Sequence, residues 1–473
     1  MNSLSQFGIV GLGVMGKSLA LNLAEKGVNV SVFNRHLAGS EESIAVNFVK
    51  EQSTRGTMCG FDDLKAFVTS IEKPRKILLM IQAGSAVDQQ LNQLVPLLDK
   101  GDIVIDGGNS FYKDTNKRTK QLNDAGIHFI GAGISGGEEG ARKGPSIMPG
   151  GDKDAYEKIA DYLNLIAAKD KSGKPCISYI GPEGSGHFAK MVHNGIEYAE
   201  MQILTEIYFL LRYYSLYPPE KIVDLFTQWQ NEGLNSYLLE ITITILRKKE
   251  DGILLLDKIL DKAEQKGTGG WSTTTAMDLG VPFSTVSEAV MARAISSFKS
   301  YRQQVSSSYN NHPATAVSNS TDSISDIIKN AYKSARIINH ETGFHLLKVA
   351  SAQYKWDLNL AEIARIWTNG CIIRSELMEQ IANTFLKEDS ILLAPFFIKE
   401  LKDIQKDFTH VISQGLTNDI ALPVLSSALN YYLGLKTLNS GANLIQAQRD
   451  YFGAHTYQRI DKHDKYFHTQ WNE

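Results

Sequence analysis

The sequence predicts an α/β domain with a doubly wound, mostly parallel, Rossmann-like sheet, followed by a large all-α domain and a C-terminal tail. Three observations predict this. A glycine pattern lies between a strand pattern and a helix pattern near the N-terminus, and strands then alternate with helices. From residue 184 onward helical periodicity dominates. We therefore expect a dinucleotide-binding domain over 1–183, a helical domain over 184–437 and a tail over 438–473.

The composition is that of an ordinary globular protein and excludes several functions. The chain has 473 residues, of which 43% are hydrophobic and 21% charged, with a net charge of −3. This charge gives no basic surface for nucleic acid or an anionic membrane, so an anionic substrate must be held by a local cluster of cations. From the residue patterns we expect no secretory signal, no membrane span and no metal site. The cysteines are few and far apart, as in the reducing cytoplasm: Cys59, Cys176 and Cys371.

A glycine-rich turn near the N-terminus has the pattern of a dinucleotide site. The strand-like run Phe7–Val10 precedes GLGVMG, and a helix-like run follows it. In the G-x-G-x-x-G motif the glycines allow a tight turn and a close approach to a pyrophosphate, which rests on the helix N-terminus. The motif alone is weak evidence, but its place between a strand and a helix is the required one. The expected cofactor contacts here are Gly11, Gly13, Val14, Met15 and Gly16.

The end of the second predicted strand, Val28–Phe33, indicates which dinucleotide is bound. Asn34 and Arg35 follow this strand, at the position where an Asp or Glu would bind the ribose 2′-hydroxyl of NAD. An amide followed by a guanidinium instead suits a 2′-phosphate, although a surface cation also explains Arg35. The sequence therefore favours NADP over NAD.

Three polar, glycine-rich loops follow later strands of the predicted sheet. IQAGSAV, DGGNS and GISGGEEGARKG come after the runs Lys76–Ile81, Asp102–Gly108 and Ile127–Gly133. Ligands of such a sheet bind at the carboxyl ends of its strands, so we expect these loops beside the nicotinamide. We expect 131–151 to form a loop, whose glycine density costs chain entropy unless a close backbone approach or a positive φ is needed. The candidates are Ile81, Gln82 and Ala83 for the cofactor, Asn109 for both ligands, and Ser135, Gly136 and Gly137 for the substrate.

The stretch 184–202 places several reactive side chains on one face of a predicted helix. At 100° per residue one arc is apolar, and the other carries Lys190, His193, Asn194, Glu197 and Tyr198. An amine and a carboxylate on one helix can serve as two separate proton-transfer groups for one substrate. A polar stripe in the core, or an ion-pair network along the helix, explains this stretch equally well.

Further features of the helical part and the tail are candidates for binding an anion. Lys266 and Thr268 lie in QKGTGGWST, a loop before a helical run, where backbone amides would help to hold a phosphate. Arg293 lies in a mostly apolar helix and needs a partner, which is either an anion or a structural carboxylate. In the tail, Arg449 and His455 crowd together. Such a tail docks onto a neighbouring subunit or is poorly ordered.

The helical part also contains a repeat and a polar interruption. Trp229 and Asn231 are followed 138 positions later by Trp367 and Asn369. Two related helical half-domains are therefore expected, with both tryptophans as core anchors. Residues 306–323, rich in Ser and Asn, are expected to form a long surface connection.

A series of sequence blocks resembles the 6-phosphogluconate dehydrogenase family. In chain order they are GLGVMG with FNR, IDGGNS, SGGEEGARKGPSIMPGG, GHFAKMVHNGIEYAEMQ, QKGTGGW, GCIIRS and ANLIQAQRDYFGAHT. The resemblance extends from the first strand to the tail. It implies the metal-free oxidation and decarboxylation of 6-phosphogluconate to ribulose 5-phosphate and CO2, with reduction of NADP, in the pentose phosphate pathway. It also implies a cytoplasmic homodimer.

The resemblance implies a role for each candidate residue. Lys190 would take the proton from the hydroxyl on carbon 3 and return it to the new ketone oxygen, and Glu197 would protonate the former carbon 2 of the enediol. The carboxylate and hydroxyls would be held by Asn109, Ser135, Gly136, Gly137, His193 and Asn194. The phosphate would be held by Tyr198, Lys266, Thr268 and Arg293, joined by Arg449 and His455 from the partner subunit.

Two positions depart from the family pattern. Many relatives carry Lys where this chain has Gln82, and Ser or Thr where it has His36. Both positions border the expected cofactor site, so they concern NADP affinity more than the chemistry. An imidazole at residue 36 could help to hold the 2′-phosphate.

The chemistry of the residues supports this assignment without the resemblance. Loss of CO2 from a β-keto acid needs an electron sink, which the newly formed ketone supplies, and an adjacent ammonium group can stabilise the enolate oxygen without a metal. Lys190 must first be neutral to accept a proton. Its pKa must therefore fall from ~10.4 toward ~7–8 through desolvation and nearby cations.

Two other functions are compatible with parts of the sequence. A non-decarboxylating 3-hydroxyacid dehydrogenase would share the first domain and Lys190, but it would not need Lys266, Arg293 and Arg449 together. A catalytically silent NADP-binding regulatory protein would need neither Lys190 nor Glu197. Release of CO2 alongside NADPH separates the first alternative from decarboxylation.

Overall fold

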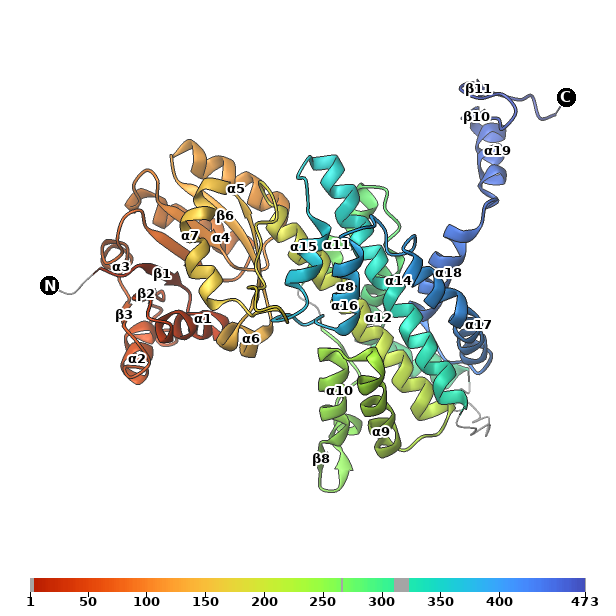
Figure 1. Ribbon diagram of the computed structural model, residues 1–473, viewed down its shortest axis with the longest axis horizontal. Coiled ribbons are helices and arrows are strands. Elements are labelled where there is room, and N and C mark those ends of the chain that lie inside the picture. Colours follow the sequence, from red (N-terminus) through yellow and green to blue (C-terminus); the bar gives the residue numbers. More distant parts are fainter. Residues whose placement is uncertain (1–3, 265–266, 310–322, 473) are drawn as a thin grey trace.

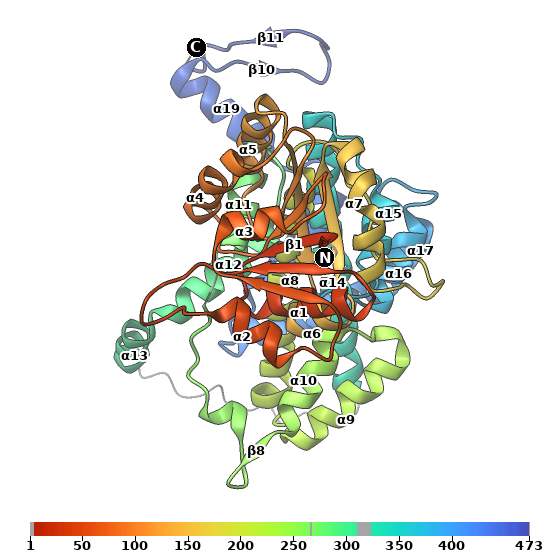
Figure 2. The same cartoon turned by 90° about the vertical axis from the view of Figure 1, so that its left-hand side faces the viewer.

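The computed structural model describes residues 4–264, 267–309 and 323–472. An α/β domain and a helical domain lie side by side, and the C-terminal tail projects away from the helical domain (Figure 1). The predicted fold class is confirmed. The far edge of the sheet meets the first long helix of the helical part. Figure 2 looks onto the α/β domain, with much of the helical domain behind it.

The α/β domain is built on one seven-stranded sheet with the order β3-β2-β1-β4-β5-β6-β7. All neighbouring strands pair in parallel except β7, which is antiparallel to β6. Most of the parallel strands are short apolar runs, because helices cover both faces of the sheet. The strands are β1 (Phe7–Val10), β2 (Val30–Phe33), β3 (Met58–Phe61), β4 (Lys76–Leu79), β5 (Ile103–Asp106), β6 (His128–Ser135) and β7 (Ser146–Gly151).

Two apolar clusters fill the two faces of this sheet. On one face Leu23 and Leu163 pack against the strands, and on the other Phe67, Leu91 and Leu122 do so. The helices of the first face are α1 (Val14–Glu25), α2 (Ile44–Glu51), α6 (Gly137–Lys143) and α7 (Lys153–Ile166). Those of the second face are α3 (Leu64–Thr69), α4 (Ser85–Leu94) and α5 (Tyr112–Asp124).

The segment GISGGEEGARKG differs from the expected loop. Its first residues complete β6, and the rest forms α6. Gly136 and Gly137 make the turn between them with φ angles of 112° and 61°, which side chains other than glycine rarely adopt. Glutamates in the first turn of α6 and cations in the last turn suit the helix dipole. The glycines therefore turn the chain, but the charged residues between them extend it as a helix.

The helical domain surrounds the long helix α8 (Ser185–Phe209). The predicted connection over 306–323 lies mostly outside the described residues, between the end of α13 and the start of α14. The other helices are α9 (Pro219–Trp229), α10 (Tyr237–Arg247), α11 (Thr268–Asp278), α12 (Ser284–Ser297), α13 (Lys299–Ser308), α14 (Ser323–Tyr354), α15 (Leu360–Ile366), α16 (Glu376–Thr384), α17 (Pro395–Thr417) and α18 (Pro423–Lys436). Short hairpin strands β8 (Lys249–Glu250) and β9 (Ile253–Leu254) follow α10.

The repeat expected from the sequence has a structural counterpart. Trp229 ends α9 and Trp367 follows α15, and their exposed fractions are 1% and 0%, so both are core anchors as predicted. Ser236 and Ser375 then cap α10 and α16 by accepting hydrogen bonds from backbone N–H groups three residues later. The two serines also pair with each other in an antiparallel bridge. The two half-domains therefore meet at their matching caps.

Glycines let α8 lie directly on the edge of the sheet. A Cβ atom on Gly133 of β6 would collide with the Cβ of Lys190. A Cβ on Gly186 would collide with the Gly131 carbonyl, and one on Gly150 of β7 would collide with the backbone of Gly186. The backbones of α8, β6 and β7 therefore lie in direct contact. This contact fixes the position of the Lys190 backbone relative to the sheet.

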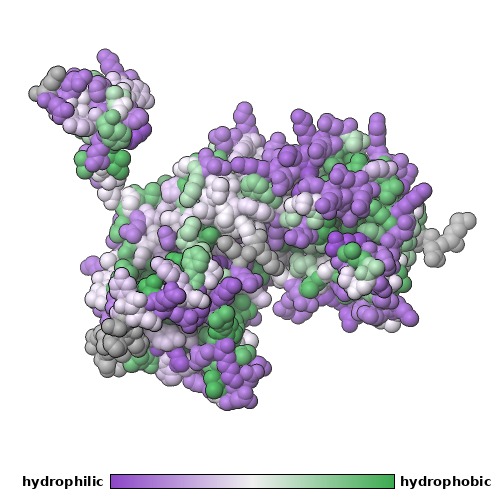
Figure 3. Space-filling model, turned by 180° about the vertical axis from the view of Figure 1, so that it is seen from behind, coloured by the Kyte–Doolittle hydropathy of each residue, from purple (hydrophilic) through white to green (hydrophobic). Residues whose placement is uncertain are grey.

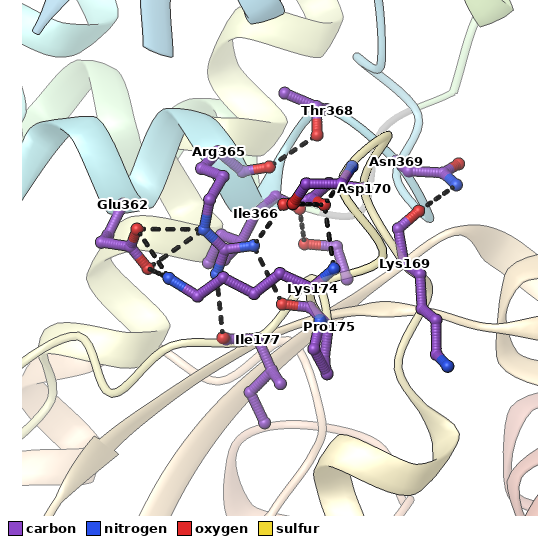
Figure 4. Close-up of polar contacts among 12 residues, drawn as sticks. Lys169, Asp170, Lys174, Pro175, Ile177, Glu362, Arg365, Ile366, Thr368 and Asn369 are labelled. Atoms are coloured by element: carbon purple, nitrogen blue, oxygen red, sulfur yellow. Dashed lines mark hydrogen bonds and ion pairs between the residues drawn. The ribbon is translucent and has the colours of Figure 1, made fainter. Parts of the chain in front are cut away.

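A polar interface holds the second half-domain to the same region (Figure 4). The guanidinium of Arg365 on α15 donates to the Asp170 carboxylate at 2.9 Å and to the Pro175 carbonyl at 3.0 Å. Glu362 accepts hydrogen bonds from Arg365 and from Lys174. The segment that joins the domains is thus tied to α15 by a branched network of charges.

Gly133→Ala is expected to lower the free energy of unfolding by about 1–3 kcal/mol, because the added methyl group forces α8 away from β6. Urea unfolding measures the change. Gly434→Ala is the matched control, since its methyl group on α18 meets no described atom within 4 Å. The control should be as stable as the wild type or slightly more stable. Equal stability of Gly133→Ala and the wild type would contradict the close approach of helix and sheet.

Candidate active site

The polar arc of α8 is enclosed in the fold. Every residue from 185 to 200 is buried except Glu197, whose side chain is 20% exposed. Lys190 is 6% exposed, and within the described residues nothing accepts a hydrogen bond from its Nζ. The amine is therefore held among packed groups with no fixed partner, while the carboxylate one turn beyond His193 reaches toward solvent.

The environment shifts Lys190 and Glu197 toward their neutral forms. Burial lowers the pKa of Lys190, and the electrostatic effect of Glu197 opposes this only in part. Burial raises the pKa of Glu197, against the opposing effects of Lys190 and Arg293. Each group thus lies near enough to influence the pKa of the other. A neutral amine and a protonated carboxyl on one helix are a base and an acid, as a two-step proton transfer requires.

His193 connects α8 to the end of β6. Its Nε2 lies 3.2 Å from the Ser135 hydroxyl, and its Nδ1 lies 3.2 Å from the Asn194 amide oxygen and 3.8 Å from the Glu197 carboxylate. Burial holds the pKa of His193 well below its ordinary value, so the ring is neutral at physiological pH. The structure therefore brings Ser135, His193, Asn194 and Glu197 together, as the sequence predicted.

A second cluster forms around Tyr198. The guanidinium carbon of Arg293 lies 3.5 Å from the centre of the Tyr198 ring, and Gly269 lies so close to that ring that a Cβ on it would collide with two ring carbons. Thr268 begins α11, whose N-terminus has no side-chain cap. Arg293 is half-buried and, in the part of the chain that the structure describes, forms no ion pair with a carboxylate. Lys266, the other predicted member, lies outside the described residues.

The glycine-rich turn fits a dinucleotide. Gly11 has a φ of 94°, and a Cβ on Gly16 would collide with the Gly11 carbonyl, so both positions need glycine. A Cβ on Gly13 would instead point into open space, which leaves room for a pyrophosphate. Gly13 provides no side-chain cap, so the first N–H groups of α1, including those of Val14 and Met15, are available to an anion.

At the end of β2 the predicted NADP-binding pair has an acidic neighbour. Asn34 is buried and accepts a hydrogen bond from the Leu12 N–H at 3.1 Å. Arg35 is exposed and forms an ion pair with Glu41 at 2.9 Å, while Asn34 also donates to Glu41 at 2.9 Å. His36 is exposed beside them. The sequence analysis missed Glu41, because only the fold of the following turn brings it back to β2.

A buried network supports the loops that follow β4 and β5. Arg118 donates to Asp88 at 2.7 Å and to the Gly84 carbonyl at 2.9 Å, and lies 3.6 Å from Asp106. Asp106 accepts hydrogen bonds from the Gly108 N–H and the Ser110 hydroxyl. Two of the predicted ligand residues in these loops, Gln82 and Asn109, are exposed, whereas Ile81 and Ala83 are partly buried. The sequence did not predict this network, because an Arg in an otherwise polar helix gives little signal.

His187 was also missed and joins α8 to the same network. Its Nδ1 lies 2.7 Å from the Thr115 hydroxyl and its Nε2 lies 3.0 Å from the Asp106 carbonyl. Burial lowers its pKa, so the ring is neutral. His187 lies one turn before Lys190, and it therefore links α8 to the loop that carries Asn109.

The structure does not bring the predicted tail residues to this site within one chain. The helix α19 (Ala442–Gly453) and the strands β10 (Tyr457–Gln458) and β11 (Tyr466–Phe467) form a separate projecting lobe (Figures 1 and 3). Arg449 and His455 are exposed there. Asp450 is buried and, although burial opposes this, hydrogen bonds from His468, Thr469 and Trp471 lower its pKa to about 2. The tail is thus an ordered unit that presents Arg449 outward.

The described residues contain neither a cluster of metal-binding side chains nor a helix suited to a membrane. No group of three or more His, Cys, Asp or Glu residues is placed there to hold a metal ion. No helix in the same residues combines the length and hydrophobicity needed to cross a membrane.

Known proteins match the whole chain. A family model of the NAD binding domain of 6-phosphogluconate dehydrogenase matches residues 6–181, and one of the 6-phosphogluconate dehydrogenase C-terminal domain matches residues 186–471. The decarboxylating 6-phosphogluconate dehydrogenase of Shigella flexneri is 46% identical over 99% of both chains. The NADP(+)-dependent, decarboxylating enzyme of Bacillus subtilis is 45% identical over 99% of both chains.

A solved structure shares the fold over nearly the entire chain. The 6-phosphogluconate dehydrogenase of Plasmodium falciparum, solved in its apo form and with NADP+ or 6-phosphogluconate, superposes with a TM-score of 0.94. It is 37% identical, and the match covers 98% of this chain and 100% of that one. Together with the glycine-rich turn and the buried polar arc of α8, these matches show that the chain belongs to the 6-phosphogluconate dehydrogenase family.

Proposed function

We propose that Lys190 and Glu197 carry the two proton transfers of the reaction of this family. That reaction is the NADP-dependent oxidation and decarboxylation of 6-phosphogluconate to ribulose 5-phosphate and CO2, a step of the pentose phosphate pathway. The observation that carries the proposal is the pairing, on one buried helix, of an amine with a lowered pKa and a carboxyl with a raised pKa. When bound, NADP accepts the hydride from carbon 3 of the substrate.

Lys190 acts first as a base and then as an acid. Its lowered pKa lets the neutral amine take the proton of the hydroxyl on carbon 3 while the hydride leaves. The resulting ammonium then faces the new ketone oxygen. As the carbon–carbon bond to the carboxylate group breaks, this oxygen gains negative charge. The buried ammonium stabilises that charge and donates its proton to the oxygen. No hydrogen bond inside the described protein has to be broken to free the amine.

Glu197 completes the reaction by protonating the former carbon 2 of the enediol. Its raised pKa favours the protonated carboxyl that this step needs. The carboxyl is seven residues from Lys190, close to two helical turns, so the two groups face the same side of α8. The solvent-exposed fraction of Glu197 gives it a route by which to recover its proton after each turnover.

The other predicted residues hold the two ends of the substrate. The neutral His193 and its partners Ser135 and Asn194 lie beside the proton-transfer groups, and with Asn109, Gly136 and Gly137 they would hold the carboxylate and hydroxyls. Tyr198, Thr268 and Arg293 form the second cluster, whose guanidinium has no carboxylate partner among the described residues. A phosphate would fill that role, with help from Lys266.

The cofactor would lie along the carboxyl edge of the sheet. The turn from Gly11 to Gly16 would hold the pyrophosphate, and Asn34, Arg35 and His36 would hold the 2′-phosphate. Ile81, Gln82, Ala83 and Asn109 would border the nicotinamide. The arrangement of Gly13 and the uncapped N-terminus of α1 support this placement.

The tail supports a homodimer in which each subunit completes the site of the other. We propose that 438–473 forms a unit distinct from the domains 1–183 and 184–437, and that it docks on a partner subunit in the cytoplasm. Apolar side chains gather on the helical half (Figure 3), and α19 exposes apolar residues although it is helical and ordered. Those on α19 are Leu444, Ile445, Tyr451 and Phe452. Arg449 and His455 would reach the partner's phosphate site.

The reaction itself is tested by measuring CO2 and NADPH together with 6-phosphogluconate as the substrate. One CO2 per NADPH is expected. NADPH without CO2 would favour the non-decarboxylating 3-hydroxyacid dehydrogenase. Tight NADP binding without turnover would favour a regulatory protein.

Lys190→Met is expected to reduce kcat by more than about 1000-fold and to raise stability by about 1–2 kcal/mol, because it removes a buried amine. The amine has a lowered pKa in the folded state and its ordinary value of 10.5 when unfolded. Unfolding of the wild type therefore takes up a proton between these values, and its stability rises with pH there. Thermal unfolding measured at pH 7 and pH 9 should therefore show that Lys190→Met exceeds the wild type in stability by less at pH 9 than at pH 7.

Lys50→Met, on the exposed side of α2, is the control and should change neither kcat nor stability. Binding of NADP to Lys190→Met should remain within about threefold of the wild type, because the amine lies outside the nucleotide turn. Unaltered turnover in Lys190→Met would refute its role.

Arg449→Ala is expected to weaken 6-phosphogluconate binding far more than NADP binding, since the arginine would contact the phosphate of the substrate only. Mixing this variant with Lys190→Met in the unfolded state and refolding the two together tests which subunit Arg449 serves. A hybrid dimer would contain one complete site, with Lys190 from one chain and Arg449 from the other, and would restore up to about a quarter of the wild-type activity. Mixtures that stay inactive would place Arg449 in its own subunit's site or outside any site.

A further inference from the structure

The end of β2 carries an acidic group at the place where the cofactor phosphate is expected. Glu41 returns to Asn34 and Arg35 because the backbone of Leu37 and Glu41 pairs in a tight turn, with hydrogen bonds of 2.8 and 2.9 Å in both directions. This turn is closed by main-chain groups. The side chain of Glu41 is therefore not needed to close the turn.

The Glu41 carboxylate engages the donors that suit a phosphate. Arg35 donates to one carboxylate oxygen through Nη2 at 2.9 Å and to the other through Nε at 3.3 Å. The Asn34 amide donates to the same carboxylate at 2.9 Å. The orientation of that amide is set, because its oxygen accepts the Leu12 N–H. These hydrogen bonds lower the pKa of Glu41, so the group is ionised at neutral pH.

We propose that Glu41 is a specificity-determining residue of the cofactor site: its carboxylate competes with the 2′-phosphate of NADP for Arg35 and Asn34, and so lowers the preference of this chain for NADP over NAD. The inference rests on the proposed placement of the 2′-phosphate at these two residues. A bound phosphate would have to displace the carboxylate or lie beside it, and both cost binding energy through the loss of hydrogen bonds or through repulsion between like charges. NAD, which lacks the phosphate, does not meet this competition.

The competition is local and electrostatic, so it should depend on salt concentration and on the position of the carboxylate. Arg35 is 68% exposed in its side chain, and salt therefore screens the effect. Glu42, the next residue, carries the same charge but accepts a hydrogen bond from the Gly39 N–H within the turn. Comparing the two glutamates separates an effect of geometry from an effect of net charge.

The test measures the binding of 2′,5′-ADP and 5′-AMP, which differ only in the 2′-phosphate, to the full-length wild type, Glu41→Gln and Glu42→Gln. We expect the wild type to prefer 2′,5′-ADP. In Glu41→Gln the ratio of the two affinities should rise by about threefold to tenfold at low salt, and by less at high salt. Glu42→Gln should leave the ratio within about twofold of the wild type.

Three outcomes would overturn the proposal. The ratio is unchanged or falls in Glu41→Gln, or Glu42→Gln raises it as much, or the gain from Glu41→Gln is undiminished in an Arg35→Gln background. The comparison in the Arg35→Gln background tests directly whether Glu41 and the 2′-phosphate compete for the Arg35 guanidinium. A wild type that binds both probes equally would instead refute the placement of the 2′-phosphate at Asn34 and Arg35, and would remove the basis of this inference with it.

Discussion

The contact between α8 and the edge formed by β6 and β7 is the constraint on which the rest of the structure depends. Three glycines, Gly133, Gly150 and Gly186, allow the backbones to touch, and no side chain larger than hydrogen fits there. The contact sets the start of the polar arc of α8 against the strand that ends in Ser135. His187 and the Arg365 network hold the helical domain in this position, so neither domain can shift without disturbing the other.

The same constraint favours the neutral form of the Lys190 amine, which its proposed role as a base requires. Because α8 is buried on both of its faces, Lys190 loses the hydration that would keep it charged, and no fixed ion pair within the described residues compensates for that loss. The same burial raises the pKa of Glu197. In the proposed mechanism, a base and an acid on one rigid helix cost stability, but the helix holds the two groups at a fixed separation throughout the reaction. Function here follows from where a helix is packed rather than from an unusual side chain.

Much of the fold and of the site was predictable because the signals are local. The turn from Gly11 to Gly16, the pair Asn34 and Arg35, and the polar arc containing Lys190 and Glu197 each lie in one short stretch with a clear period or spacing. The structure brings Ser135 to His193 as expected, and it shows that the arc is enclosed rather than solvated. The roles of these residues remain proposals.

The parts that were not predicted depend on contacts between distant segments. Strand β7 and helix α6 lie in a stretch where glycine obscures the strand and helix patterns, so both were taken for a loop. Arg118 and Glu41 act through partners that only the tertiary structure supplies. The central claim, that packing against the sheet makes Lys190 a base, is tested most directly by an NMR pH titration of its side-chain amine in the intact enzyme. The account predicts a pKa well below 10.5, and a value at or above 10.5 would contradict it.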